Sequence, residues 1–341
     1  MADKHYRALV CTHWGHWNEL ELQALQRPVL APGQVRIRVR HAGIGFALSL
    51  FVAGTYQRRP PLPFTPGTEV AGEIMEVAPD VRQLRPDLRT GQRVIAALDW
   101  GALAQEAVAL AHTVYALPDA VPLCAAAALP ITYATSWSAL QWAARLQAGE
   151  SVLVHGASGG LGMAAVQIAS HLGAQVIATA STEEKRSAAL VHGAAHALPS
   201  DAVALPTAVK ALCPAGGAQV VFDPVGGDLA DASLRCMAPG GRLLAMGFAS
   251  GRIPQFPANL LLVKNLGVLG FNYGRYIGWG LTDERAVHAP AVQALVGQIT
   301  QAVASGAIAA PRTMHFPLPQ WQQALDTTMS RRAVGKVILD F

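Results

Sequence analysis

The stretch VLVHGASGGLG, residues 152–162, decides the fold class of this 341-residue chain. It opens with three apolar residues typical of a buried strand, continues through a glycine-rich run, and leads into an alanine-rich segment of helical composition. Glycines allow a sharp turn and a close approach of the backbone to a ligand, and a helix start offers free N–H groups. This order predicts a strand–turn–helix unit that binds the pyrophosphate of a dinucleotide; a turn that serves only helix–sheet packing is the alternative. The candidate contacts are Gly156, Ala157, Ser158, Gly159, Gly160, Leu161 and Gly162.

Strands and helices alternate along the chain after this turn. Helical composition covers residues 160–172 and 183–192, and short apolar strands are expected at 175–179, 219–222 and 242–246. Such an alternation predicts βαβ units with parallel strands. We therefore expect an α/β protein with a doubly wound parallel sheet of the Rossmann type in residues 125–270.

The first 124 residues have a different pattern, rich in strands. Residues 35–40 (VRIRVR) alternate apolar and polar side chains, and 69–77 and 92–97 have strand composition. Four prolines between 60 and 66 predict a loop. Near the carboxyl end, helices are expected at 292–304 and 321–329, and a strand at 335–341. Two consecutive domains, or a first domain completed by the carboxyl-terminal segment, would both fit this pattern.

The end of the second expected strand indicates which dinucleotide binds. Sites that prefer NAD place an acidic residue about 20 residues beyond the turn, where it binds the ribose hydroxyls. Here the strand ends in Ala180, Ser181 and Thr182, and Lys185 and Arg186 follow. Hydroxyl groups beside cations suit a 2′-phosphate, so we expect NADPH rather than NADH. The alternative is that Lys185 and Arg186 are ordinary solvated helix charges.

Composition excludes several other classes of protein. The 26 basic and 22 acidic residues are scattered, which gives no reason to expect a nucleic-acid partner. The four cysteines are far apart and form no CxxC motif, so no zinc lobe or disulfide framework is predicted. No apolar run reaches 18 residues, and no signal peptide is visible at the amino terminus. A soluble cytoplasmic protein without a membrane partner is expected.

Five segments of the chain resemble one known family. VLVHGASGGLG is joined by ITYATSWSAL (131–140), FDPVGG (222–227), GTYQRRPPLPFTPGTEVAG (54–72) and GKVIL (335–339). In this order they resemble the zinc-independent (zeta-crystallin-like) quinone oxidoreductases of the medium-chain dehydrogenase/reductase superfamily. The resemblance implies a GroES-like substrate domain of residues 1–124, completed by 271–341, a Rossmann NADPH-binding domain of residues 125–270, and a homodimer.

The resemblance also implies further cofactor-binding residues. Thr135 and four residues after later strands would lie near the nicotinamide, and three residues would hold the 2′-phosphate. The nicotinamide set is Thr135, Gly247, Phe248, Phe271 and Asn272, and the phosphate set is Ser181, Lys185 and Arg332.

Two departures from related sequences concern the metal and the substrate. The histidine ligand of the zinc-dependent relatives falls on Thr68, and the first loop lacks their cysteine, so no catalytic metal is expected. Where relatives often carry Asn and Asp, this chain has Gly45 and Leu48. Fewer polar groups near the substrate favour an apolar acceptor, or altered or lost activity.

Without a catalytic metal, the expected reaction is hydride transfer from NADPH to an electron-poor carbon. Quinones and α,β-unsaturated carbonyls both accept hydride in this way. Tyr56 lies where related 2-enoyl thioester reductases place a catalytic tyrosine, and its phenol could donate a proton to an enolate; an aromatic packing role fits equally. The alternatives are therefore a quinone or enone reductase, a 2-enoyl thioester (enoyl-CoA) reductase, and a non-catalytic NADPH-binding protein.

Overall fold

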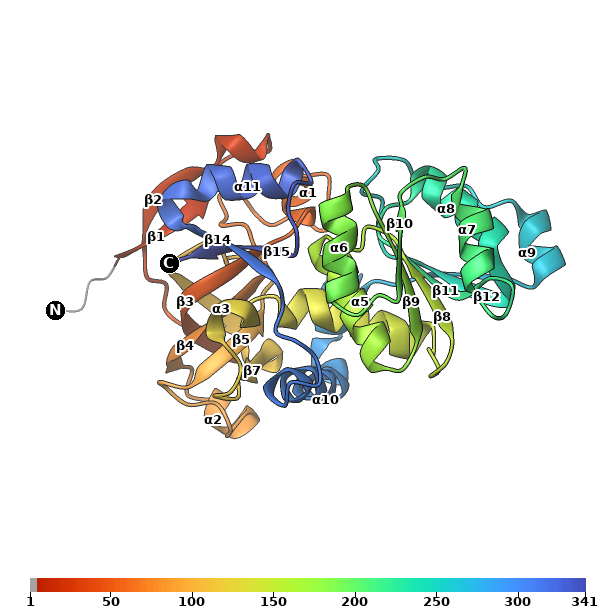
Figure 1. Cartoon of the computed structure of the whole chain (residues 1–341). Coiled ribbons are helices and arrows are strands. Elements are labelled where there is room, and N and C mark those ends of the chain that lie inside the picture. The colour runs from red at the N-terminus through yellow and green to blue at the C-terminus, as the bar shows by residue number, and fades with distance from the viewer. Residues whose placement is uncertain (1–4) are drawn as a thin grey trace. The chain divides into compact units, whose positions relative to one another are not determined.

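The computed structural model describes residues 5–341, which form two compact units (Figure 1). Unit 1 contains the chain up to Ile131 together with Gly274–Gly306 and Ala310–Phe341. Unit 2 contains Thr132–Tyr273 and Ala307–Ala309. Unit 1 is therefore built from the amino-terminal and carboxyl-terminal parts of the chain, with unit 2 formed by the part between them.

Unit 2 contains a six-stranded sheet in the order β10-β9-β8-β11-β12-β13, and every neighbouring pair is parallel. Its strands are β8 (Ser151–Val154), β9 (Gln175–Ala180), β10 (His196–Pro199), β11 (Ala218–Asp223), β12 (Met237–Ala245) and β13 (Gly267–Gly270). The central strand β8 is buried along its whole length, as expected of a parallel strand covered on both faces. The connecting helices are α5 (Gly160–His171), α6 (Glu183–Val191), α7 (Leu205–Leu212), α8 (Gly227–Cys236) and α9 (Ala258–Lys264).

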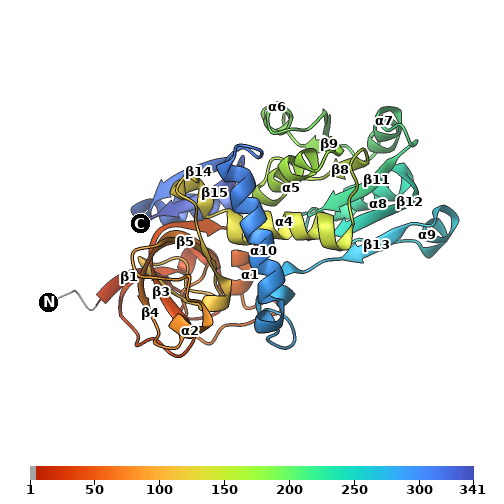
Figure 2. The ribbon, with the colours of Figure 1, turned by 90° about the horizontal axis from the view of Figure 1, so that it is seen from below.

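The strand order places a topological switch point at the centre of this sheet. From β8 the chain moves outward to β9 and β10, then returns to β11 on the other side of β8 and moves outward to β12 and β13. Figure 2 shows β13 at one edge of the sheet, as the order requires. Ligands of doubly wound sheets bind at the carboxyl ends of the strands that flank such a switch point.

Unit 1 contains a seven-stranded sheet in the order β14-β15-β3-β4-β5-β7, with β6 paired to β3. Its strands are β3 (Gln34–Ile44), β4 (Glu69–Val77), β5 (Arg93–Ala97), β6 (Glu106–Leu110), β7 (Val114–Ala116), β14 (Thr313–Pro317) and β15 (Lys336–Asp340). The apolar residues of β3, β4 and β15 share one hydrophobic core with α1 (Ala47–Val52) and α11 (Trp321–Met329). A separate hairpin joins β1 (His5–Val10) to β2 (Glu21–Gln26).

The α/β class and the parallel sheet predicted from the sequence are confirmed, and several elements differ in length. The strand expected at 35–40 continues to Ile44, because residues 41–44 pair with β15. The helix expected at 292–304 begins at Arg285 as α10 (Arg285–Ala304). Residues 129–143 consist of α4 (Ala134–Ser138) and two π-helical stretches, Leu129–Tyr133 and Ala139–Ala143.

Candidate active site

The predicted cofactor-binding residues of unit 2 follow the carboxyl ends of its parallel strands. The glycine turn follows β8, Ser181 follows β9, and Gly247 comes two residues after the end of β12. Phe271 and Asn272 come directly after β13. Since parallel strands end at the same edge of a sheet, the fold brings these residues to one edge, on both sides of the switch point.

The glycines of the turn after β8 have different physical roles. Gly156 has φ +57°, a left-handed conformation that favours glycine. A Cβ at Gly162 would lie 2.2 Å from the Gly156 carbonyl oxygen, so this position is required for close packing of α5 on the turn. A Cβ at Gly159 would meet only that same oxygen, at 3.6 Å. The space beside Gly159, at the start of α5, is therefore open to a ligand.

The start of α5 leaves backbone N–H groups free, as the predicted strand–turn–helix unit requires. Gly159 is the N-cap and has no side chain to occupy the free N–H groups of the first helical turn. The Gly159 amide donates to the Gly156 carbonyl at 3.0 Å, and the Ala157 amide donates to the Thr179 carbonyl at 3.1 Å. These two bonds fix the turn between β8 and β9. A pyrophosphate would meet the remaining amides and the positive end of the helix dipole.

The residues after β9 form a polar, exposed segment with no carboxylate at the end of the strand. Thr182 caps α6, since its hydroxyl accepts a hydrogen bond from the Lys185 amide at 3.3 Å. Arg186 forms an ion pair with Glu183 and also donates to the Ala180 carbonyl. Arg186 is therefore paired within its own helix.

The turn after β11 is held by an aspartate that the sequence analysis did not single out. Asp223 Oδ1 accepts hydrogen bonds from the amides of Val225 and Gly226, both at 2.9 Å. Gly226 has φ +70°, and a Cβ there would lie 3.2 Å from the Phe248 ring. Aspartate is typical of such turns, so FDPVGG could have predicted this role. The turn supports Phe248, whose side chain is exposed.

Thr135 lies in α4, between the two π-helical stretches. Next to it, Ser136 donates to the Leu161 carbonyl at 3.0 Å, which links α4 to the start of α5. Thr135 itself is half-buried. Irregular helix turns of this type are frequent at functional sites.

Tyr56 lies in unit 1, on the loop that follows α1, and its ring is stacked on Phe51 with centroids 4.3 Å apart. The amides of Thr55 and Tyr56 both donate to the Leu50 carbonyl, so the backbone of this loop is also fixed. Burial raises the pKa of the Tyr56 phenol, which keeps it protonated at neutral pH. Within residues 5–341 its hydroxyl has no hydrogen-bond partner. The predicted packing role of Tyr56 is therefore present, and its hydroxyl is not used by a neighbouring group among these residues.

A charged network that the sequence analysis missed holds the same loop. Arg58 donates to Asp99 at 2.8 Å and lies over the Trp100 ring, 5.4 Å from its centroid. Asp99 also accepts from Trp279 at 3.1 Å and from the buried Arg285 at 2.9 Å. Arg58 is therefore held in place by an ion pair and by contact with an aromatic ring. Partners 41 and 186 residues apart leave no local pattern in the sequence.

Gly45 and Leu48, the two departures from related sequences, have distinct environments. Leu48 lies in the hydrophobic core of unit 1 with 5% exposure. A Cβ at Gly45 would lie 3.5 Å from Lys336 Nζ, and Lys336 forms a buried ion pair with Glu69. Thr68, at the position expected for a zinc-ligating histidine, lies next to this ion pair in the chain. A charged pair within unit 1 thus lies close to Gly45.

Arg332 and His155 also have partners within the structure. Arg332 lies in unit 1, where its guanidinium pairs with Asp326 and donates to Ser330 at 2.9 Å. His155 is completely buried, and its two ring nitrogens contact the hydroxyls of Thr179 and Ser233 at 2.9 and 2.7 Å. Burial lowers the pKa of His155, so it is a neutral structural residue.

Comparisons with known proteins agree with this architecture. Residues 31–119 match the alcohol dehydrogenase GroES-like domain, and residues 160–287 match the family described as zinc-binding dehydrogenase. The chain is 36% identical over 340 residues to quinone oxidoreductase-like protein 2 of Rattus norvegicus, covering 98% of this chain and 92% of that protein.

Two solved structures of NADPH complexes are also similar. One is a mycobacterial protein (30% identity, TM-score 0.88), and the other is the quinone oxidoreductase of Thermus thermophilus (30% identity, TM-score 0.80). Each comparison covers 98% of this chain and 100% of the relative.

The GroES-like domain, the parallel sheet and the glycine turn at its switch point define a medium-chain dehydrogenase/reductase. Within that superfamily, the chain belongs to the quinone oxidoreductase-like family. The resemblance seen in the sequence is thereby confirmed. No helix among residues 5–341 combines the length and the apolar character needed to cross a membrane.

Proposed function

We propose that this protein is an NADPH-dependent reductase of quinones or α,β-unsaturated carbonyls that needs no catalytic metal. The observation that carries the proposal is the turn after β8, where Gly159 leaves open space at the start of α5 while Gly162 packs against backbone. This arrangement fits a pyrophosphate, and two structures similar to this chain were solved with NADPH.

Different residues around the turn would hold different parts of the cofactor. The free amides in the first turn of α5 would bind the pyrophosphate, and Ser181 and Lys185 would hold the 2′-phosphate. Arg332 lies in unit 1 and is paired with Asp326, so it is left out of this set. Thr135, Gly247, Phe248, Phe271 and Asn272 would surround the nicotinamide, which supplies the hydride when the cofactor is bound. The missing acid after β9 supports NADPH over NADH, because a carboxylate there would repel the 2′-phosphate.

Tyr56 would act on the acceptor. Its phenol remains protonated at neutral pH, so it can donate a hydrogen bond to an oxygen on which negative charge develops. The stack on Phe51 and the Arg58–Asp99 ion pair hold the loop that carries it. Residues 1–124 with 271–341 would form the substrate domain, and residues 125–270 the NADPH-binding domain.

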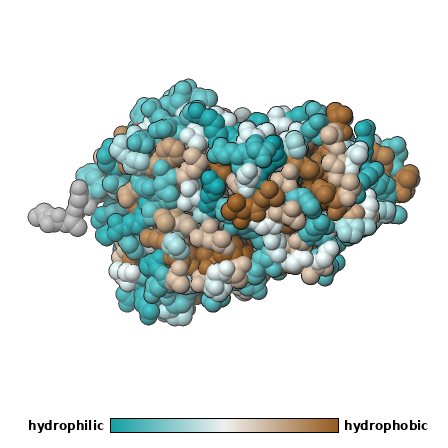
Figure 3. Space-filling model, in the orientation of Figure 1, coloured by the Kyte–Doolittle hydropathy of each residue, from teal (hydrophilic) through white to brown (hydrophobic). Residues whose placement is uncertain are grey.

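We further propose a homodimer. Strand β13 lies at the edge of the unit 2 sheet, and on the neighbouring helix α9 the side chains of Leu262 and Val263 are 78% and 77% exposed. The apolar patch at the right-hand end of Figure 3 lies over α9. Burial of this patch against a second copy would remove it from water. Sedimentation of the parent protein and of Leu262→Glu tests this: a monomeric parent would contradict the proposal.

The experiment for the reaction compares three acceptors side by side. Consumption of NADPH would be followed with an ortho-quinone, a short enone and crotonyl-CoA, before and after prolonged EDTA treatment. We expect turnover with the quinone or the enone that survives EDTA. Efficient turnover with crotonyl-CoA alone would favour an enoyl thioester reductase. Tight NADPH binding without turnover of any of the three would favour a non-catalytic NADPH-binding protein, consistent with Gly45 and Leu48.

A further inference from the structure

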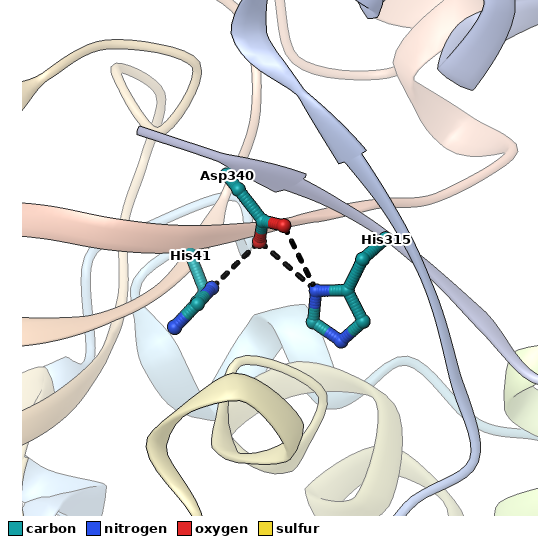
Figure 4. A group of neighbouring side chains, drawn as sticks. All are labelled: His41, His315 and Asp340. Atoms are coloured by element: carbon teal, nitrogen blue, oxygen red, sulfur yellow. Dashed lines mark hydrogen bonds and ion pairs between the residues drawn. The ribbon is translucent and has the colours of Figure 1, made fainter.

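Three potential metal ligands meet on one face of the unit 1 sheet, although they are far apart in the sequence. His41 lies on β3, His315 on β14 and Asp340 on β15. Their ligand atoms all lie within 4.8 Å of one another, and among residues 5–341 they form the one such group of three or more. Figure 4 shows both imidazole rings turned toward the carboxylate of Asp340, which lies between them.

Strand register brings the three side chains together. His41 lies directly opposite Asp340 in the antiparallel pair of β3 and β15. His315 lies opposite Ile338 in the parallel pair of β14 and β15. Side chains of a strand alternate between its two faces, so Ile338 and Asp340 lie on the same face. The backbone pairing of three strands therefore fixes the positions of all three ligands.

The contacts within the group are short and directed. His41 Nδ1 lies 2.7 Å from Asp340 Oδ1, and His315 Nδ1 lies 2.9 Å from the same oxygen. On the far side of its ring, His315 Nε2 lies 2.9 Å from the Thr313 hydroxyl. This hydroxyl can donate to the nitrogen or accept from its N–H, so it can orient the ring with Nδ1 either protonated or bound to a metal.

We propose that His41, His315 and Asp340 form a binding site for one Zn²⁺ ion. Two imidazole nitrogens and one carboxylate oxygen are a ligand set that zinc accepts, with water in a fourth position. Mg²⁺ and Ca²⁺ prefer sites built of oxygen ligands and are expected to bind far more weakly. The side chains of the three ligands are 20–34% exposed, so an ion and its water ligand can reach the group from solvent.

The ligand side chains must rotate to accept the ion, since the three ligand atoms lie within 4.8 Å of one another. Zinc bonds of about 2.0–2.1 Å in a tetrahedral arrangement separate neighbouring ligand atoms by about 3.3 Å. The Asp340 oxygen must therefore retreat from His41 Nδ1 by roughly half an ångström, which side-chain rotation can provide. The proton on each Nδ1 moves to Nε2 of the same ring, which at His315 faces the Thr313 hydroxyl.

Zinc at this position would join β14 and β15, from the carboxyl-terminal segment, to β3 of the amino-terminal segment. Because the bound ion favours the folded state, it would raise the thermal stability of the protein. The proposed role is structural, and hydride transfer to the acceptor does not use it. A negative result for the zinc site would therefore not count against the proposed reaction, and failure of the proposed reaction would not count against the zinc site.

The test measures zinc binding to the full-length chain after chelator treatment and removal of any affinity tag. Competition with a chromophoric chelator should give one Zn²⁺ per chain, with affinity reduced about a hundredfold or more in Asp340→Asn and His315→Gln. Thr313→Val keeps all three ligands and should reduce affinity about tenfold, as removal of an outer hydrogen-bond partner typically does. His13→Gln removes another histidine paired with a carboxylate and should change nothing.

Two further readouts make the result decisive if a ligand variant folds poorly. Co²⁺ should give the visible absorption of a tetrahedral site in the parent protein and in His13→Gln. Zinc should raise the thermal midpoint of the parent, and Mg²⁺ should not. The proposal is overturned if Asp340→Asn, shown to be folded by circular dichroism, binds zinc as tightly as the parent. An absent tetrahedral cobalt spectrum in the parent overturns it as well.

Discussion

Replacing Gly162 by alanine should destabilise the protein, because the added methyl group would collide with backbone. The new Cβ would lie 2.2 Å from the Gly156 oxygen, 2.7 Å from the Gly156 carbonyl carbon and 2.9 Å from the Ala157 Cα. None of these atoms belongs to a flexible side chain, so the turn or α5 itself must shift. The turn is also tied to β9 through the Ala157 amide, which limits how far it can move.

Two opposing terms determine the size of this effect. Alanine is favoured over glycine inside a helix by about 1 kcal/mol. Overpacking costs about 1–3 kcal/mol even where side chains can adjust, and a collision with backbone lies at or above the upper end of that range. We therefore expect Gly162→Ala to lower the free energy of unfolding by about 2 kcal/mol or more. A loss of about 2 kcal/mol corresponds to a fall in Tm of roughly 4–8 °C for domains of this size.

Gly159→Val is the matched variant, and it should abolish NADPH binding while leaving stability nearly unchanged. Its Cβ has room, at 3.6 Å from the Gly156 oxygen, and Gly159 has an ordinary φ of −78°. Stability should change by no more than the roughly 1 kcal/mol cost of a poorer N-cap, whereas NADPH affinity should be lost. Guanidinium unfolding and calorimetric titration with NADPH measure the two quantities separately. A Gly162→Ala protein as stable as the parent, or unchanged NADPH affinity in Gly159→Val, would refute this division of roles.

Three other substitutions test other parts of the molecule. Lys185→Ala should weaken NADPH about tenfold and leave NADH nearly unchanged, and equal parent affinities for the two cofactors would contradict this. Tyr56→Phe should lower kcat/KM for quinones less than about fivefold, but kcat with an enoyl-CoA about a hundredfold. Arg242→Met should cost about 2–3 kcal/mol, since Arg242 donates to Glu150 through two 2.7 Å bonds. Burial opposes ionisation of Glu150, but these bonds hold its pKa below the ordinary value. The loss of unfolding free energy in Arg242→Met, relative to the parent, should therefore be largest at neutral pH. It should become smaller as the pH falls through that lowered pKa.

Features set by neighbouring residues were predictable from the sequence. Strand β4 and helix α11 have the predicted bounds, because their patterns lie within one segment and match the period of the element. The glycine turn was predictable for the same reason, since strand, turn and helix follow each other directly. Its place at a switch point depends on the strand order, which the alternation of strands and helices does not give.

Features set by distant residues were not predictable. The last two residues of strand β3, Gly43 and Ile44, pair with β15, some 300 residues later. The Asp99 network and the group around Asp340 join side chains from separate segments, and nothing near either aspartate indicates its partners. Burial of Leu48 depends on which face of α1 packs on the core, and that packing involves the whole unit 1 sheet.

A match to the glycine motif does not separate glycines that are needed for folding from glycines that are needed for ligand binding. Gly156 is needed for its positive φ, Gly162 for the close approach of α5 to the turn, and Gly159 for neither reason. Two of these three glycines would be required in any protein with this strand–turn–helix unit, whether or not it binds a nucleotide. The position where a side chain has room and glycine still stands is therefore the one that points to a ligand, and Gly159 is that position.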